Sequence, residues 1–167
     1  NGNSTVVGQA NSESAIAVGA VSYLNTPAFG VGTPTIASFS STGGTPVNNV
    51  VRSKPDLCAP NGGNTTVDLG GPNIDGDQFF NFFGTSAAAP HAAAVAALIK
   101  EAKVKFANEN ISPAGIKSIL QSSALDMGAP GIDFINAAGL VQANAALRTF
   151  ATPKPEIIGL QPLNVGT

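Results

Sequence analysis

Residues 83–98 read FGTSAAAPHAAAVAAL, a serine followed at once by an alanine-rich stretch. The pattern predicts a helix over residues 85 to about 105, with Thr85 as its N-cap and Ser86 in its first turn. Because its many small alanine side chains let neighbouring backbones approach closely, we expect it to be the central, buried helix. The dipole and unpaired N–H groups of the first turn would stabilise negative charge beside the Ser86 hydroxyl. This is a suitable place for a hydroxyl nucleophile.

A serine nucleophile also needs a base that accepts its proton and a third group that orients the base. The only histidine in the 167 residues is His91, five positions after Ser86. Helix residues five apart point about 140° away from each other, so these two side chains face different sides. We therefore interpret His91 as a helix residue that packs or bonds locally. If Ser86 is a nucleophile, its partners lie outside this chain.

Residues 84–91 resemble the nucleophile signature of the subtilisin-like serine peptidases, the subtilases, which read G-T-S-x-A-x-P and often continue with His. Four other segments resemble the same family, in the same order along the chain. Residues 15–21 resemble its buried strand ending in V-G-A, and residues 36–43 resemble its A-S-F-S-x-x-G segment. Residues 54–60 resemble its K-P-D-[IV]-x-A-P-G segment, and residues 138–147 resemble its closing helix. The resemblance covers residues 1 to about 150.

The resemblance implies an α/β chain that forms part of a subtilisin-like three-layer fold, with a mostly parallel sheet flanked by helices and the N-terminal part of the domain missing. It implies a serine endopeptidase that cleaves polypeptide substrates through Ser86. In this family the triad aspartate and histidine precede the serine, and neither segment is found here. We therefore expect residues 1–150 to be the C-terminal portion of a peptidase domain, inactive without its N-terminal half. A secreted or cell-surface location is implied by the same resemblance.

The family also uses an asparagine side chain as an oxyanion donor, usually in a G-N-x-G turn ahead of the V-G-A strand. Asn3 follows Gly2 and matches that dipeptide, whereas Asn1, or a residue before the chain start, agrees better with the usual spacing. Asn3 is equally well interpreted as a solvated turn residue. The sequence leaves the oxyanion asparagine open among these positions.

Two other function classes compete with a peptidase. A non-catalytic subtilase relative would use the same scaffold as a peptide-binding or structural module, and the intact Ser86 favours the enzyme over it. An α/β-hydrolase esterase needs glycine two residues after its serine. Ala88 at that position argues against an esterase.

Composition indicates a folded chain and excludes further classes of partner. Apolar residues make up 43% and charged residues 11% of the chain, and the net charge is −2, so we expect no nucleic-acid partner. No apolar stretch reaches the length of about 18 residues that spans a bilayer, so we expect no transmembrane segment. The single cysteine, Cys58, lies in an apolar run that predicts a buried strand.

The loop residues Asp75-Gly76-Asp77 raise the question of a calcium site. Calcium takes about six to eight oxygen ligands, which these two carboxylates do not supply, so we interpret the segment as a surface turn. We predict no cofactor for this chain, although structural calcium in the complete domain is compatible with the sequence. Four phenylalanines precede Ser86, and we favour anchoring of the turn over a substrate subsite as their role: Phe79, Phe80, Phe82 and Phe83.

The rest of the chain predicts short elements joined by loops. We expect a parallel core strand over residues 15–21, further strands over 50–57 and 65–69, and a turn over 61–64. Ser112 and Pro113 predict the N-cap and first residue of a helix that reaches Ala124. A last helix is expected to begin at Asn136 or Ala138.

Residues 151–156 predict a stiff linker, and residues 157–167 predict the first strand of a following β-module, possibly immunoglobulin-like. With half of the parallel sheet missing, one sheet edge would be bare. Such an edge favours pairing with another chain, so we expect the fragment to self-associate or to need a partner.

Overall fold

The computed structural model describes residues 4–151, so Asn1, Asn3, the predicted β-module and most of the predicted linker lie outside the described residues. The strands are β1 (Val18–Ser22), β2 (Pro46–Val47), β3 (Val50–Val51), β4 (Leu57–Asn61), β5 (Asn64–Thr65) and β6 (Phe80–Asn81). The helices are α1 (Thr85–Ala102), α2 (Pro113–Ser122) and α3 (Ala143–Arg148). Short helical turns are η1 (Gly8–Asn11), η2 (Tyr23–Asn25), η3 (Pro27–Phe29) and the π-helical η4 (Lys103–Ala107).

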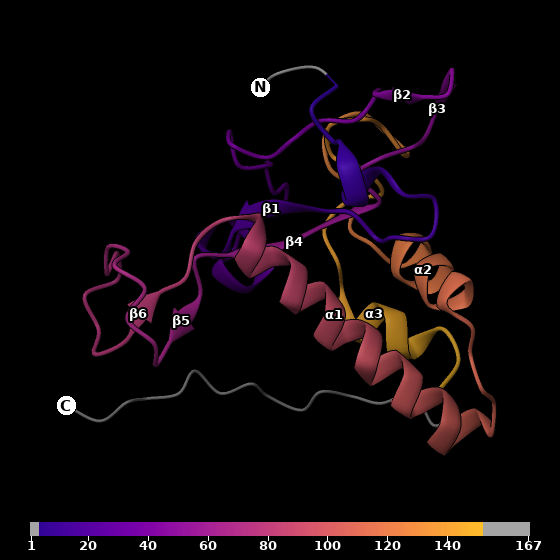
Figure 1. The fold of residues 1–167 in the computed structure, drawn as a ribbon. Helices are drawn as coiled ribbons and strands as arrows, with labels where there is room; N and C mark the ends of the chain where they lie inside the picture. Colours follow the sequence, from indigo (N-terminus) through magenta and orange to yellow (C-terminus); the bar gives the residue numbers. More distant parts are fainter. Residues whose placement is uncertain (1–3, 152–167) are drawn as a thin grey trace.

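Two parallel strands, β1 and β4, form the centre of the sheet, as Figure 1 shows. Val18 lies opposite Leu57 at one end of the pair. Residues 139–141 extend the sheet beyond β4, because Cys58 N–H donates to the oxygen of Gly139 (2.8 Å) and its own oxygen accepts from Val141 N–H (2.9 Å). Neither of these strands contains a charged residue, which suits strands that are covered on both faces. The predicted parallel core strand is confirmed.

The two faces of this sheet contact different layers. Successive strand side chains point to opposite faces. On one face, side chains such as Ala20 and Leu57 pack against α1, α2 and α3, which lie together on that side in Figure 1. On the other face, Val21 and Cys58 pack against the loop residues Met127 and Leu140. The chain therefore has the predicted α/β class, with its helices grouped over one face of the described sheet.

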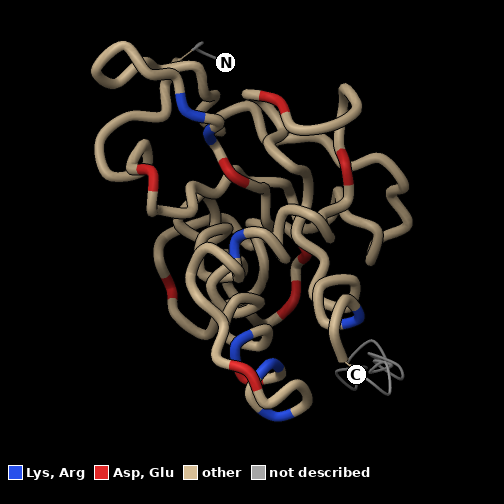
Figure 2. The backbone as a smooth tube through the Cα atoms, turned by 90° about the vertical axis from the view of Figure 1, so that its right-hand side faces the viewer, with Lys and Arg blue, Asp and Glu red and all other residues tan. Residues whose placement is uncertain are grey.

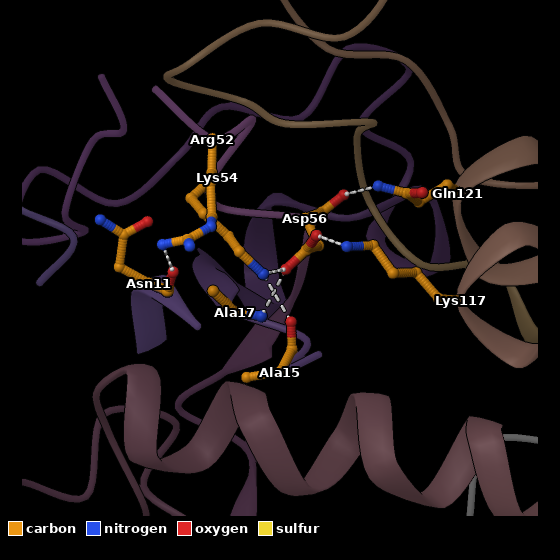
Figure 3. Close-up of polar contacts among 8 residues, drawn as sticks. All are labelled: Asn11, Ala15, Ala17, Arg52, Lys54, Asp56, Lys117 and Gln121. Atoms are coloured by element: carbon orange, nitrogen blue, oxygen red, sulfur yellow. Dashed lines mark hydrogen bonds and ion pairs between the residues drawn. The ribbon is translucent and has the colours of Figure 1, made fainter. Parts of the chain in front are cut away.

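A buried ion pair fixes the amino ends of β1 and β4 (Figure 3). The side chains of Lys54 and Asp56 are 2% and 0% exposed, and Lys54 Nζ lies 2.7 Å from Asp56 Oδ2. Lys54 Nζ also donates to the oxygen of Ala15 (2.5 Å). Asp56 Oδ2 accepts the N–H of Ala17 (2.7 Å), so the carboxylate takes the place of a backbone acceptor just before β1.

The same carboxylate ties α2 to the sheet. Lys117 of α2 pairs with Asp56 Oδ1, and Gln121 Nε2 donates to the backbone oxygen of Asp56 (3.2 Å). Residues 52–56 form no strand, so the predicted strand over 50–57 is wrong. Its first residues form β3, which pairs with β2 as a hairpin, and the core strand β4 begins only at Leu57.

The end of the domain also differs from the prediction. Helix α2 begins as expected, since Ser112 Oγ accepts the N–H of Gly115 (3.1 Å). The last helix, however, begins at Ala143 rather than at Asn136 or Ala138. The preceding segment is held extended, because Leu125 and Leu140 exchange two backbone hydrogen bonds of 2.8 Å. Sheet pairing therefore takes precedence over helix formation in this segment. The predicted strand over 65–69 is likewise reduced to β5.

Helix α1 confirms the predicted helix, but within residues 4–151 only one of its sides is buried. The residues that face the sheet and the other helices are buried: Ala87, Ala88, Ala92, Ile99 and Ala102. The opposite side is exposed over most of its length, and its apolar residues include Ala89, Ala93, Ala94, Ala97 and Leu98. No element within residues 4–151 covers this side, because β1, β4, α2 and α3 all pack against the buried side or beside it.

Candidate active site

Ser86 lies in the first turn of α1 and is exposed. The N-cap is Gly84 rather than the predicted Thr85, with φ 99° and ψ 175°, a conformation that glycine adopts readily. The oxygen of Gly84 accepts the N–H groups of Ala87 (3.0 Å) and Ala88 (3.2 Å). Within the described residues, the N–H groups of Thr85 and Ser86 make no hydrogen bond, and neither does the Ser86 hydroxyl. A free hydroxyl therefore lies beside free N–H donors at the positive end of a helix.

The ring of Phe83, directly before this turn, packs against Gly62 and Gly71. A Cβ added at Gly62 would lie 3.0 Å from Phe83 Cε1, and one added at Gly71 would lie 3.5 Å from Phe83 Cδ2. The ring of Phe83 therefore packs between two backbone segments that lack side chains. This contact supports an anchoring role for Phe83 rather than a place in an open substrate subsite.

His91 bonds to its own helix and not to Ser86. Its Nδ1 lies 2.8 Å from the oxygen of Ala87 and must donate, because a carbonyl oxygen can only accept. The ring lines an open groove of about 360 Å³ together with Phe82 and Gly63. No hydrogen bond joins His91 to Ser86 in the part of the chain that the structure describes. The structure thus brings no base to Ser86.

The carboxylates of Asp75 and Asp77 accept hydrogen bonds from other residues of the chain. Tyr23 Oη donates to Asp75 Oδ2 (2.8 Å), and burial together with this bond raises the pKa of Tyr23 to about 12. The same bond lowers the pKa of Asp75. Asp77 accepts hydrogen bonds from Asn64 Nδ2 (2.5 Å) and from Phe79 N–H (2.6 Å). Among residues 4–151, no group of three or more His, Cys, Asp or Glu is placed to hold a metal ion.

The cysteine and the basic side chains of the described residues offer no further catalytic group. Cys58 is buried, and this burial raises the pKa of its thiol to about 12, so the thiol is protonated at neutral pH. Figure 2 shows lysines and arginines spread over the chain, with a small group near the carboxyl end of α1. In that group, Lys105 pairs with Glu101 and Lys103 with Glu109. No helix among the described residues is long and apolar enough to cross a membrane.

One residue beside the nucleophile turn was not recognised from the sequence. Asn61 belongs to the segment predicted as a turn, but it is the last residue of β4 and is 3% exposed. Its Oδ1 accepts the N–H of Gly84 (3.3 Å), two residues before Ser86. The signal available in the sequence was a departure from the resembling K-P-D-[IV]-x-A-P-G segment, which has glycine where this chain has Asn61.

Comparisons with known proteins show the family of this chain. A family model described as "Subtilase family" matches residues 1–139. The serine protease AprX of Bacillus subtilis is 35% identical over 128 residues, which are 71% of this chain and 26% of that protein. Subtilisin-like protease SBT2.3 of Arabidopsis thaliana is 29% identical over 142 residues, 80% of this chain and 15% of that protein. The chain thus spans 15% to 26% of the length of these curated relatives.

Solved structures show the same fold. The CspB protease of Clostridium perfringens matches with a TM-score of 0.68 at 23% identity, covering 94% of this chain and 30% of that chain. Fervidolysin from Fervidobacterium pennivorans, a keratinolytic enzyme related to subtilisin, matches with a TM-score of 0.57 at 27% identity, covering 88% of this chain and 20% of that one.

Proposed function

The chain belongs to the subtilase family, and from this premise we propose that the complete protein is a serine endopeptidase in which Ser86 is the nucleophile. Its substrates are polypeptides. The observation that carries the proposal is the free, exposed Ser86 hydroxyl in the first turn of α1, beside N–H groups that have no partner in the described structure. Export to the cell surface or medium belongs to the same proposal, because the family resemblance implies it.

In this mechanism, Ser86 Oγ attacks the carbonyl carbon of the scissile bond while a histidine accepts the hydroxyl proton. The carbonyl oxygen becomes an oxyanion, which the Ser86 N–H and an asparagine amide stabilise by hydrogen bonds. The protonated histidine then gives its proton to the leaving amine, and the C–N bond breaks. Water hydrolyses the resulting acyl-enzyme by the same route and restores Ser86. Asn1 and Asn3 remain the candidates for the asparagine within this chain.

The base and its aspartate come from another segment of the protein in this proposal. His91 is the only histidine in the chain, and its Nδ1 is occupied by the backbone oxygen of Ala87. Residues seven apart on a helix lie about 20° from the same direction, so Ser86 and Ala93 point to the same side of α1. That side is exposed and apolar. A segment that covers Ala93 would therefore also approach Ser86 and could deliver a histidine there.

The proposal is tested on the complete protein with a peptide substrate, by comparing Ser86→Ala with His91→Gln. We expect Ser86→Ala to lower kcat about 10⁴-fold or more, because the attacking atom is lost. We expect His91→Gln to keep kcat within about tenfold, since glutamine preserves a donor for helix contacts. Full activity of Ser86→Ala would refute the endopeptidase mechanism. A parent protein that is folded but inactive would favour the non-catalytic relative, and a loss in His91→Gln equal to that in Ser86→Ala would make His91 the base.

A further inference from the structure

Antiparallel backbone pairing, here called the ladder, connects the turn before Ser86 to the end of β4. Residues 61–65 run beside residues 80–84, with Asn64 opposite Asn81 in the β5–β6 pair. Nearer to Ser86, Gly62 N–H donates to the oxygen of Phe82 (2.8 Å), and Phe82 N–H donates to the oxygen of Gly63 (3.0 Å). These hydrogen bonds therefore fix residues 80–84, which lead to Ser86, relative to the core strand β4.

The last rung of this ladder is made by a side chain. Asn61 Oδ1 accepts the N–H of Gly84 at 3.3 Å, in line with the backbone bonds that precede it. Asn61 is itself fixed, since it is 3% exposed and lies opposite Ser22 in the β1–β4 pair. Gly84 in turn sets the start of α1 through its oxygen, which accepts two N–H groups of the first turn. A single carboxamide thus connects the parallel sheet to the residue that begins the nucleophile helix.

The ladder does not depend on Asn61 for its own integrity. Asn81 is 1% exposed and bridges the two segments, because its Nδ2 donates to the oxygen of Gly62 (2.9 Å) and to Asn64 Oδ1 (2.8 Å). Its Oδ1 accepts the N–H of Ile74 (2.8 Å) from the loop. Asn81 therefore holds the hairpin together, whereas the Asn61 side chain contacts the turn that leads directly into Ser86.

We propose that Asn61 is a positioning residue for Ser86. Its carboxamide oxygen fixes Gly84 in the positive-φ conformation from which α1 starts, and this sets the direction of the Ser86 hydroxyl and N–H. Small errors in the placement of a nucleophile lower the rate of the chemical step more than substrate binding. The inference rests on the proposed endopeptidase function. It concerns this chain in particular, because the segment that residues 54–60 resemble continues with glycine, which has no side chain to accept this bond.

The test uses the complete, active protein and three changes at one position. Asn61→Leu keeps the approximate volume and removes the acceptor, Asn61→Gly restores the residue of the resembling segment, and Asn61→Asp keeps an acceptor oxygen. We expect kcat to fall about tenfold in Asn61→Leu and Asn61→Gly with KM unchanged, and Asn61→Asp to recover most of this loss. The two acceptor-free variants are independent, so a folding defect in one leaves the other to decide.

Gln121→Ala is the matched control, because it removes a side-chain bond to the backbone at the other end of the β4 segment. We expect this variant to keep kcat within about twofold even where its melting temperature falls as far as that of the Asn61 variants. Parental kcat in folded Asn61→Gly or Asn61→Leu would overturn the proposal, as would an equal loss in Gln121→Ala. Ser86→Ala measured beside them separates the two hypotheses: if it is inactive while Asn61→Leu is fully active, only the positioning role fails.

Discussion

At the scale of single residues, Asp56 is the group on which the buried polar contacts converge. Its carboxylate contacts Lys54, Lys117 and the N–H of Ala17, and its side chain is 0% exposed. Its Oδ1 has no hydrogen bond and only the ion pair with Lys117. A charge in this position is tolerated because its partners are in place, and each partner belongs to a different part of the fold.

We expect Asp56→Ala to lower the free energy of unfolding by about 3–5 kcal/mol, because it leaves the Lys54 ammonium buried with only a backbone oxygen as partner. Lys117→Ala is the control, since the Lys117 side chain is 27% exposed and water can replace it beside Asp56. It should cost about 1 kcal/mol or less. Urea unfolding of the complete protein measures both, and equal losses would contradict the account of the buried pair.

At the scale of elements, α1 is a helix with two apolar sides of which only one is covered. The covered side packs on β1 and β4. Between Ser86 and the charged residue Lys100, the exposed residues of α1 are four alanines with Pro90, His91 and Leu98. A helix side that faces water ordinarily carries polar residues. We infer that this side contacts a further segment in the complete protein, and Ser86 lies at its amino end.

We expect Ala93→Glu to lower the melting temperature and the activity of the complete protein, because the carboxylate would be buried without a partner where another segment packs. Ser118→Glu provides the control, because Ser118 is exposed on α2, and its change should leave both quantities near those of the parent. Thermal unfolding with an activity assay compares the two. Equal melting temperatures for the two variants would show that Ala93 stays in water.

The same element shows what local sequence could and could not predict. A helix was predicted over residues 85 to about 105, and α1 covers 85–102, because alanine has the highest helix propensity; Ser112 was predicted as an N-cap because capping is a local interaction. The predicted burial of α1 is seen on one side only within residues 4–151, because apolar residues show that a helix side can be buried and do not show which segment covers it. Composition alone could not distinguish a covered side of the helix from an exposed one.

Predictions that depended on distant partners were the least accurate. Residues 138–141 were predicted as helix and are extended, because Leu140 pairs with Leu125 and Val141 with Cys58. Residues 52–56 were predicted as strand and are irregular, and the side chain of Asp56 in this stretch contacts Lys54 and the N–H of Ala17, which are contacts that the local pattern does not reveal. In the candidate site, the place of Ser86 followed from its motif. The contact of Asn61 with Gly84 did not, since it joins residues 23 positions apart.

At the scale of the whole molecule, the two ends of β1 differ in how the described chain covers them. The carboxyl end of β1 is bonded on its outer side, where Ala20 accepts the N–H of Ala37 (2.8 Å) and donates to Ser40 Oγ (2.8 Å). The amino end opens instead onto an apolar groove of about 280 Å³ between Ile16, Val18 and the alanines of α1. We expect the 167-residue chain alone to associate through this edge and to lack hydrolytic activity.

The most direct test of the central claim is covalent labelling with an organophosphonate serine probe, followed by mass spectrometry of the modified peptide. The complete protein is predicted to take up one probe molecule at Ser86, because a base from another segment activates that hydroxyl, while the isolated 167-residue chain is predicted to stay unlabelled. Modification of a different serine in the active protein would contradict the account. Labelling of the isolated chain at the rate of the complete protein would contradict it as well.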